Sequence, residues 1–142
     1  MENYEEEVEK NTKRNDKFIN EFEEWLNQKN LTPRTINKHL CNIDLFINSY
    51  LAYYEVIKME EGVSFVCDFL GDWFIRKCAW SSANSIKEMA ASIKKFYQCM
   101  SDKKYIEKEK YQRLTEKLKE RMDGILEEMR YYELKLFEDY FL

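Results

Sequence analysis

The chain has 142 residues, which is enough for one domain with a sizeable core. Only three glycines and one proline are present, while 44% of the residues are hydrophobic and 35% are charged, so we expect an all-α fold built from amphipathic helices. The net charge of −4 argues against a general polyanion binder, and no run of about 18 apolar residues exists that would span a bilayer. The chain begins with acidic residues rather than with a basic signal-peptide start, and we therefore expect a cytoplasmic location.

The charge is distributed unevenly along the chain. Residues 1–31 carry nine acids and five bases, and residues 105–142 carry ten acids and eight bases. Residues 32–104 carry ten bases and eight acids. The middle of the chain is therefore the only part with a basic balance, and the excess is small.

The first half of the chain predicts two helices after a charged start. Residues 1–15 are highly charged, and we expect a frayed helix start or a disordered arm. Apolar residues at helical spacing between Phe18 and Leu26 define the first helix. After a short link, Thr32 and Pro33 predict the start of a second helix that runs to about Tyr54, because threonine caps free amides and proline suits the first helical position.

The next segments predict a third and a fourth helix. Residues 64–77 are heavily apolar and predict a largely buried helix. A turn over residues 78–82 follows, and Ser81 or Ser82 is the expected cap of the fourth helix, with Ser85 and Glu88 as a possible capping box.

The last part of the chain changes in character. Residues 105–132 predict a long charged helix with a narrow apolar seam, and residues 134–142 are too apolar for an ordinary solvated tail. We expect this tail to pack on the bundle or on a partner, either a second copy or another protein. The predicted organisation is thus a charged arm (1–15), a helical domain (16–104) and a long helix with its apolar tail (105–142).

Four segments of the middle region carry a family resemblance: Leu31–Ile36 (Leu-Thr-Pro-Arg-Thr-Ile), Phe46, Trp80–Ser82, and Ile93–Tyr97 (Ile-Lys-Lys-Phe-Tyr). These segments lie in or just before the second and fourth predicted helices, and each of these two helices has a cap, an apolar stripe and a basic outer face. The region from Asp16 to Asp102 resembles the N-terminal SAM-like, core-binding domain of phage integrases and tyrosine recombinases. The resemblance implies a four-helix bundle, here followed by the additional long helix.

The resemblance also implies a partner, double-stranded DNA, because core-binding domains grip DNA chiefly through their second and fourth helices. Helical spacing independently turns basic and amide side chains away from the apolar stripes of those two helices, where lysine and arginine suit phosphates and asparagine and glutamine suit base edges. The same side chains are also common on the solvated face of an ordinary bundle. The candidate DNA-binding residues are Thr32, Arg34, Thr35, Lys38, Asn42, Ser82, Asn84, Lys87, Lys94, Lys95 and Gln98.

Two departures from the family limit what the resemblance implies. The turn before the fourth helix contains Ala79 and Trp80 where the family often has glycine, which makes this turn bulkier. Integrases continue into a catalytic domain with a tyrosine nucleophile and an arginine–histidine set, but only 40 residues follow Asp102, and none of them is histidine. We therefore expect no strand cleavage and no enzymatic activity.

The residues that could hold a metal or a cofactor form no convincing pattern. The four cysteines are scattered and predict free thiols, buried or half-buried, in a reducing compartment. His39 is the single histidine and is best interpreted as structural, and Asp68 with Asp72 as the polar edge of a helix. We expect no metal site and no cofactor.

Two hypotheses for function remain. The first is a non-catalytic DNA-binding module that grips duplex DNA with its second and fourth helices, and the alternative is a protein-interaction or adaptor module without DNA affinity. Basic residues joined on one exposed face favour DNA, whereas the same residues scattered or paired with acids favour the adaptor.

Overall fold

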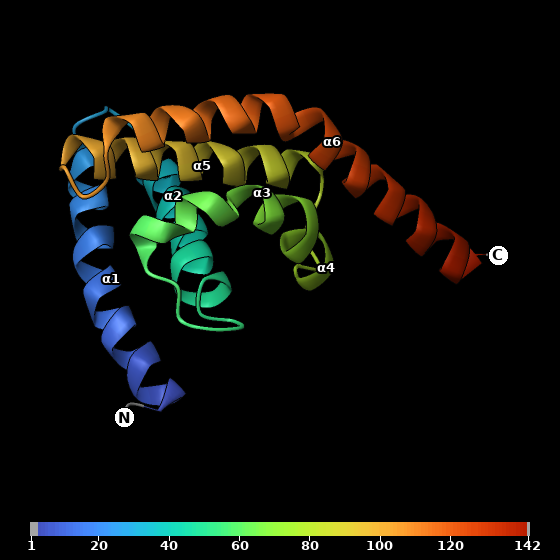
Figure 1. Cartoon of the computed structure of the whole chain (residues 1–142). Helices are drawn as coiled ribbons and strands as arrows, with labels where there is room; N and C mark the ends of the chain where they lie inside the picture. The colour runs from blue at the N-terminus through green and yellow to red at the C-terminus, as the bar shows by residue number, and fades with distance from the viewer. Residues whose placement is uncertain (1–2, 142) are drawn as a thin grey trace.

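The computed structural model describes residues 3–141, and this part of the chain contains helices and short turns but no strand. The prediction of an all-α fold with a long C-terminal helix is confirmed. Helix α5 (Ala83–Asp102) lies at the centre of the bundle. Helices α1 (Tyr4–Asn27) and α2 (Pro33–Asp44) pack against it, and α6 (Lys108–Phe141) runs along its opposite side (Figure 1).

Helix α1 begins at Tyr4, so most of the predicted arm over residues 1–15 is helical rather than disordered. The side chain of Asn3 caps this helix by accepting a hydrogen bond from a first-turn N–H group at 2.8 Å. Further along, Asn15 is completely buried and donates a 2.8 Å hydrogen bond to the side-chain oxygen of Asn48. This long-range contact holds the start of α1 against the bundle, and a single-sequence pattern does not reveal it.

The second and third predicted helices are present but change pitch along their length. Helix α2 continues directly into a π-helical turn, η1 (Leu45–Tyr50), so this helix ends at Tyr50 and not near Tyr54. The helix predicted over residues 64–77 is a run of short pieces. They are a 3₁₀ turn η2 (Met59–Phe65), α3 (Val66–Asp68), a π-helical turn η3 (Phe69–Trp73) and α4 (Phe74–Lys77).

The two π-helical turns bring their aromatic side chains together in the core. The ring of Phe69 lies 5.1 Å from that of Phe46 and 4.9 Å from that of Tyr50, measured between centroids. Trp73 packs edge-on against Tyr50 at 5.4 Å. Such offset and edge-to-face pairs add to the burial of apolar area, and they fix η1 against η3.

A second close contact ties η2 to the central helix. The hydroxyl of Tyr97 on α5 is fully buried and donates a 2.8 Å hydrogen bond to the carbonyl of Met59. A Cβ atom added to Gly62 would lie 2.7 Å from that hydroxyl oxygen and 2.7 Å from a methyl carbon of Leu51. Glycine is therefore required here by the close approach of η2 to Tyr97.

The last helix is packed over its first part only. Leu114, Leu118, Ile125 and Met129 are buried in one seam along the bundle. Beyond Met129 the bundle ends, and the remaining turns slope away from it (Figure 1). We call residues 130–141 the arm.

Tyr132 at the base of the arm is half-buried against the core, and the other apolar side chains of the arm are exposed. A space of about 330 Å³, lined in part by Gly71, Ile75 and Leu136, separates the base of the arm from η3 and α4. The described residues of the segment 134–142 are thus exposed on their own bundle, because the bundle is too short to cover the full seam, and Leu142 lies outside the described residues. The prediction left packing on the bundle or on a partner open, and packing on a partner stays a prediction. The exposed fractions are 56% for Leu134, 38% for Leu136, 56% for Phe137, 80% for Tyr140 and 72% for Phe141.

Candidate nucleic-acid interface

The first turn of α2 forms as the sequence predicts, with one candidate residue as its cap and a second bonded to that cap. The Thr32 hydroxyl oxygen accepts a 3.2 Å hydrogen bond from the N–H of Thr35, and the two hydroxyl groups lie 3.0 Å apart. Thr32 and Thr35 therefore position the helix start, whereas Arg34 between them is exposed.

The first turn of α5 is capped by a different pair from the one predicted. Ser82 accepts a hydrogen bond from the N–H of Ser85 at 3.0 Å, and the Ser85 hydroxyl lies 2.7 Å from the N–H of Ser82. The capping box thus joins Ser82 to Ser85, and the predicted pairing of Ser85 with Glu88 is wrong. Trp80, in the bulky preceding turn, is 61% exposed, and Asn84 in the first turn of the helix is exposed as well.

The outer surface of α5 carries the candidate lysines in one continuous strip. Lys87, Lys94 and Gln98 are exposed, and Ala91 and Lys95 beside them are half-buried. None of the three lysines forms an ion pair with any residue that the structure describes. We call these five residues the α5 strip.

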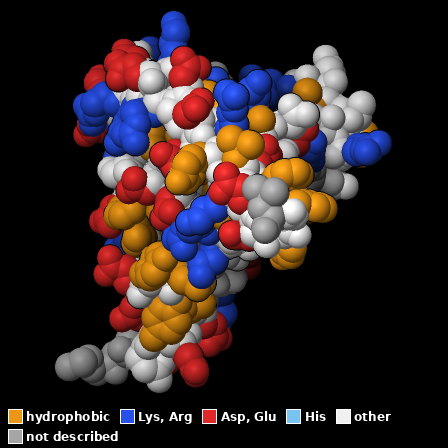
Figure 2. Space-filling model, turned by 90° about the vertical axis from the view of Figure 1, so that its right-hand side faces the viewer, with side chains coloured by type: hydrophobic (Ala, Val, Ile, Leu, Met, Phe, Trp, Pro, Cys, Tyr) orange, Lys and Arg blue, Asp and Glu red, His pale blue; other side chains and the backbone are white. Residues whose placement is uncertain are grey.

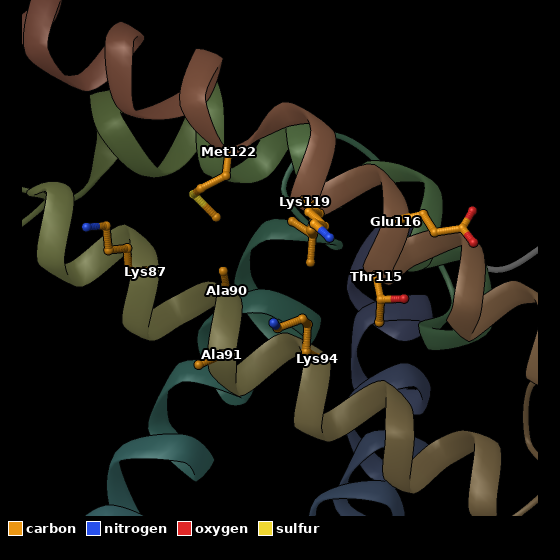
Figure 3. Close-up of a pocket in the computed structure, with 9 residues that line it drawn as sticks. Lys87, Ala90, Ala91, Lys94, Thr115, Glu116, Lys119 and Met122 are labelled. Atoms are coloured by element: carbon orange, nitrogen blue, oxygen red, sulfur yellow. The ribbon is translucent and has the colours of Figure 1, made fainter.

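One edge of the strip borders a groove between α5 and α6. The groove has a volume of about 570 Å³, and Ala90, Ala91, Leu118 and Met122 supply its apolar lining. Figure 3 shows Lys87 and Lys94 along α5, with Met122 and Lys119 facing them from α6.

Lys119 adds a third lysine to this groove, and reasoning from the sequence missed it. The family resemblance ends at Asp102, and nothing in the sequence pattern places residue 119 beside residue 94. The signal that existed was its helical spacing, which puts Lys119 beside the apolar seam of the long helix.

The other edge of the strip adjoins α2. The Nζ atom of Lys38 lies 2.6 Å from the carboxylate of Glu88, and both side chains are about half exposed. Arg34 is one turn before Lys38 on α2 and therefore shares its face. The outer faces of α2 and α5 thus meet at this ion pair, and one of the candidate cations is partly neutralised there.

Asn42 takes part in packing instead of projecting outward. Its side-chain amide donates a 2.9 Å hydrogen bond to the hydroxyl oxygen of Ser92, a fully buried residue of α5. Nδ1 of His39 lies 2.7 Å from the same oxygen, and the Ser92 hydroxyl donates to the Glu88 carbonyl at 3.1 Å. These contacts leave the amide of Asn42 bound to the α2–α5 contact, away from any base edge.

His39 at this contact is affected by burial and by two nearby lysines. The pKa of His39 is lowered from 6.5, first by burial and then by the positive charges of Lys95 and Lys38. The imidazole is therefore a neutral part of the helix contact at neutral pH. The two lysines act on the ring from different helices, which indicates that they lie on adjoining parts of one surface.

The remaining reactive side chains have structural partners or stay buried. Asp72 accepts two hydrogen bonds from Arg76, at 2.7 and 3.0 Å, and this arginine lowers the pKa of the carboxyl group. Cys67, Cys78 and Cys99 are buried free thiols, and burial raises the pKa of each, whereas Cys41 is exposed. Within residues 3–141 no group of three His, Cys, Asp or Glu side chains is arranged to hold a metal ion.

The structure therefore brings together part of the predicted set. Arg34, Lys38, Lys87, Lys94 and Lys95 lie on the adjoining outer faces of α2 and α5, and Asn84 and Gln98 are exposed on α5. Thr32 and Ser82 are helix caps, Thr35 is bonded to Thr32 in the first turn of α2, and Asn42 is a packing residue. The class that fold and surface define is an all-α bundle with a lysine-bearing central helix and a projecting C-terminal helix.

Comparison with known proteins adds no identification: no protein family, no curated protein and no solved structure matches this chain. In the part of the chain that the structure describes, no helix is both long and apolar enough to cross a membrane.

Proposed function

We propose that this protein is a non-catalytic DNA-binding module that holds duplex DNA against the outer faces of α2 and α5. The observation that carries the proposal is the α5 strip, in which Lys87, Lys94 and Lys95 reach solvent on one helix face without ion-pair partners among the described residues. Arg34 and Lys38 extend the basic surface onto α2. The resemblance to integrase core-binding domains favours the same two helices.

The residues on this surface suit phosphate contacts better than base readout. Four or five lysine and arginine side chains would neutralise backbone phosphates, whereas Asn42 is already hydrogen-bonded to Ser92. Glu88 lies among the cations and the net charge of the chain is −4, so binding is weak and salt-sensitive. The proposal includes a cytoplasmic location, which four free cysteines support.

A fluorescence-anisotropy titration of mixed-sequence duplex DNA at two salt concentrations tests this proposal. With four to five phosphate contacts, the logarithm of the binding constant should fall with the logarithm of salt concentration with a slope of roughly −4, at about 0.9 per contact. The double variant Lys94→Glu/Lys95→Glu should abolish binding.

The matched control is Lys103→Glu/Lys104→Glu, which makes the same charge change at two exposed positions just beyond the end of α5. This control should retain most of the affinity. If both double variants lose binding equally, the affinity reflects total charge and the α5 strip is not the site. If neither loses binding, the contact surface lies elsewhere.

The second candidate is a protein-interaction module, and the arm is the observation that favours it. Its exposed tyrosine, phenylalanine and leucine side chains are typical of the centre of a protein interface, where aromatic residues are enriched, and not of a solvated helix surface. A chain without measurable DNA affinity at low salt, whose arm nevertheless binds a protein, would support this candidate over the first.

A further inference from the structure

The arm continues the apolar seam of the bundle without a break. Leu118, Ile125 and Met129 are buried at spacings of seven and four residues, and Tyr132, Leu136 and Tyr140 follow at three, four and four. Tyr132 is still half-buried against the core, whereas Leu136 and Tyr140 are exposed. The sequence of α6 therefore continues an apolar face along the arm beyond Tyr132, where the described residues of the bundle leave it exposed.

The arm also bears a pair of stacked aromatic side chains beside this seam. The rings of Phe137 and Phe141 lie 4.8 Å apart between centroids, and both are more than half exposed. With about 150–250 Å² for each aromatic side chain, the exposed face of the arm amounts to several hundred Å². Figure 2, which looks from the side toward which the arm projects, shows hydrophobic side chains at the surface among mixed charges. Isolated monomers rarely leave so much contiguous apolar surface in water.

The groove between α5 and α6 differs from the arm in the sign of most of its charges, but its lining is apolar like the exposed face of the arm. Lys87, Lys94 and Lys119 lie around a lining of alanine, leucine and methionine side chains, and Glu116 also lines the groove (Figure 3). The arm carries three acids, Glu133, Glu138 and Asp139, and two bases, Arg130 and Lys135. Its three carboxylates beside an apolar face complement the three lysines of the groove.

We propose that the arm of one chain docks into the α5–α6 groove of a second copy, and that the second arm docks reciprocally. Helical spacing permits this arrangement about a two-fold axis. At 1.5 Å per residue, Leu136 in the arm and Leu118 in the groove each lie about 14 Å along α6 from Glu127. Two α6 helices that cross in antiparallel sense near Glu127 therefore place each arm beside the partner's groove.

The interface would be isologous, with the same two patches contributed by each chain. Two arms and two grooves together would have to bury the roughly 1,000 Å² expected of a specific interface. The arrangement goes beyond DNA binding, but it shares Lys87 and Lys94 with the α5 strip. The test therefore uses the protein without DNA, so that failure of one proposal is distinguishable from failure of the other.

Sedimentation equilibrium over a concentration series measures the association directly. We expect a reversible monomer–dimer equilibrium with a micromolar dissociation constant that weakens as salt is added, because charge pairs contribute to it. A full-length chain that stays monomeric up to millimolar concentration at low salt would overturn the proposal.

Substitutions in the arm test its role without disturbing the bundle. Phe137→Glu/Phe141→Glu should raise the dissociation constant at least tenfold, and circular dichroism should show an unchanged fold because both side chains are more than half exposed. The matched control is Tyr53→Ser/Tyr54→Ser, which removes two exposed aromatic side chains from the loop after η1. Equal weakening by the control would overturn the assignment to the arm.

A charge exchange tests the groove. One chain carries Lys87→Glu/Lys94→Glu/Lys119→Glu, and the other carries Glu133→Lys/Glu138→Lys/Asp139→Lys. Each chain alone should be monomeric, because each then pairs like charges. A mixture should form a heterodimer, since both the reversed arm with the reversed groove and the native arm with the native groove are complementary.

The result of this exchange distinguishes docking of the arm in the groove from other modes of dimerisation. Heterodimer formation only in the mixture supports arm-in-groove docking. A groove-reversed chain that still dimerises as well as the native chain would show that the arms pair with each other instead, and it would overturn the proposal.

Discussion

The Nζ atom of Lys38 lies 2.6 Å from the carboxylate of Glu88, and this ion pair joins α2 to α5 within the proposed DNA surface. Both side chains are about half exposed, so the pair contributes little to stability, at most about 1 kcal/mol. Its larger effect is on binding, because it places a negative charge among the cations and occupies the ammonium group of Lys38.

We predict that Glu88→Gln strengthens DNA binding several-fold and makes the salt dependence steeper by about one phosphate contact, or roughly 0.9 in the log-log slope. Lys38 then becomes free to neutralise a phosphate. Anisotropy titrations at several salt concentrations measure both quantities. Glu61→Gln, which removes an exposed acid from η2, is the control and should change neither by as much. An unchanged slope for Glu88→Gln would show that Lys38 makes no phosphate contact.

We predict that stability falls as the pH drops below 6.5, through His39. Burial and the charges of Lys95 and Lys38 lower the pKa of this side chain in the folded protein, so the unfolded chain binds a proton first. The stabilising difference is fully present above 6.5 and is lost as the pH falls through the lowered folded pKa.

Urea unfolding between about pH 7.5 and pH 5.5 checks this prediction, since carboxyl groups titrate mostly below that range. His39 is the only histidine of the chain, and His39→Gln should therefore flatten the profile. A variant with the same slope as the native protein in this range would contradict the assignment.

Two glycine substitutions should change stability in opposite directions. Gly62→Ala places a methyl group 2.7 Å from the Tyr97 hydroxyl and from Leu51, and should cost about 1–3 kcal/mol. Gly124→Ala in α6 meets nothing within 4 Å, and should stabilise the helix by up to about 1 kcal/mol. Thermal unfolding of the two variants side by side measures the difference, and a stable Gly62→Ala protein would refute the close approach of η2 to α5.

Removal of residues 134–142 should leave the melting temperature of the monomer nearly unchanged, because the described side chains of this segment are exposed. The truncated chain should be monomeric and should bind DNA at least as tightly as the full chain, since Glu138 and Asp139 are gone and Lys87 and Lys94 are uncovered. Differential scanning calorimetry at low protein concentration and DNA anisotropy measure the two effects. Weaker DNA binding after truncation would indicate that the arm itself supports the DNA contact.

The sequence by itself determined the features that depend on local hydrogen bonds and helical periodicity. Thr32 with Pro33 marked the start of α2, and Ser82 was one of two predicted caps for α5, because a cap is satisfied within one turn of its own helix. The exposed positions of Lys87 and Lys94 also follow from helical spacing alone. The all-α class follows from composition and period in the same way.

The tertiary structure alone decided which polar and apolar groups find partners far away in the chain. Asn42 was predicted on an outer helix face and Asn15 falls in the charged segment 1–15, yet both form helix contacts, with Ser92 and Asn48 respectively. Lys38 meets Glu88, 50 residues further on, and neither residue's neighbours in sequence reveal it. The arm has a seam like that of a packed helix, but the length of the bundle determines where cover ends. A one-dimensional pattern does not contain the packing between distant segments. This packing therefore determined which charges lie on the candidate surface, and it left the arm exposed.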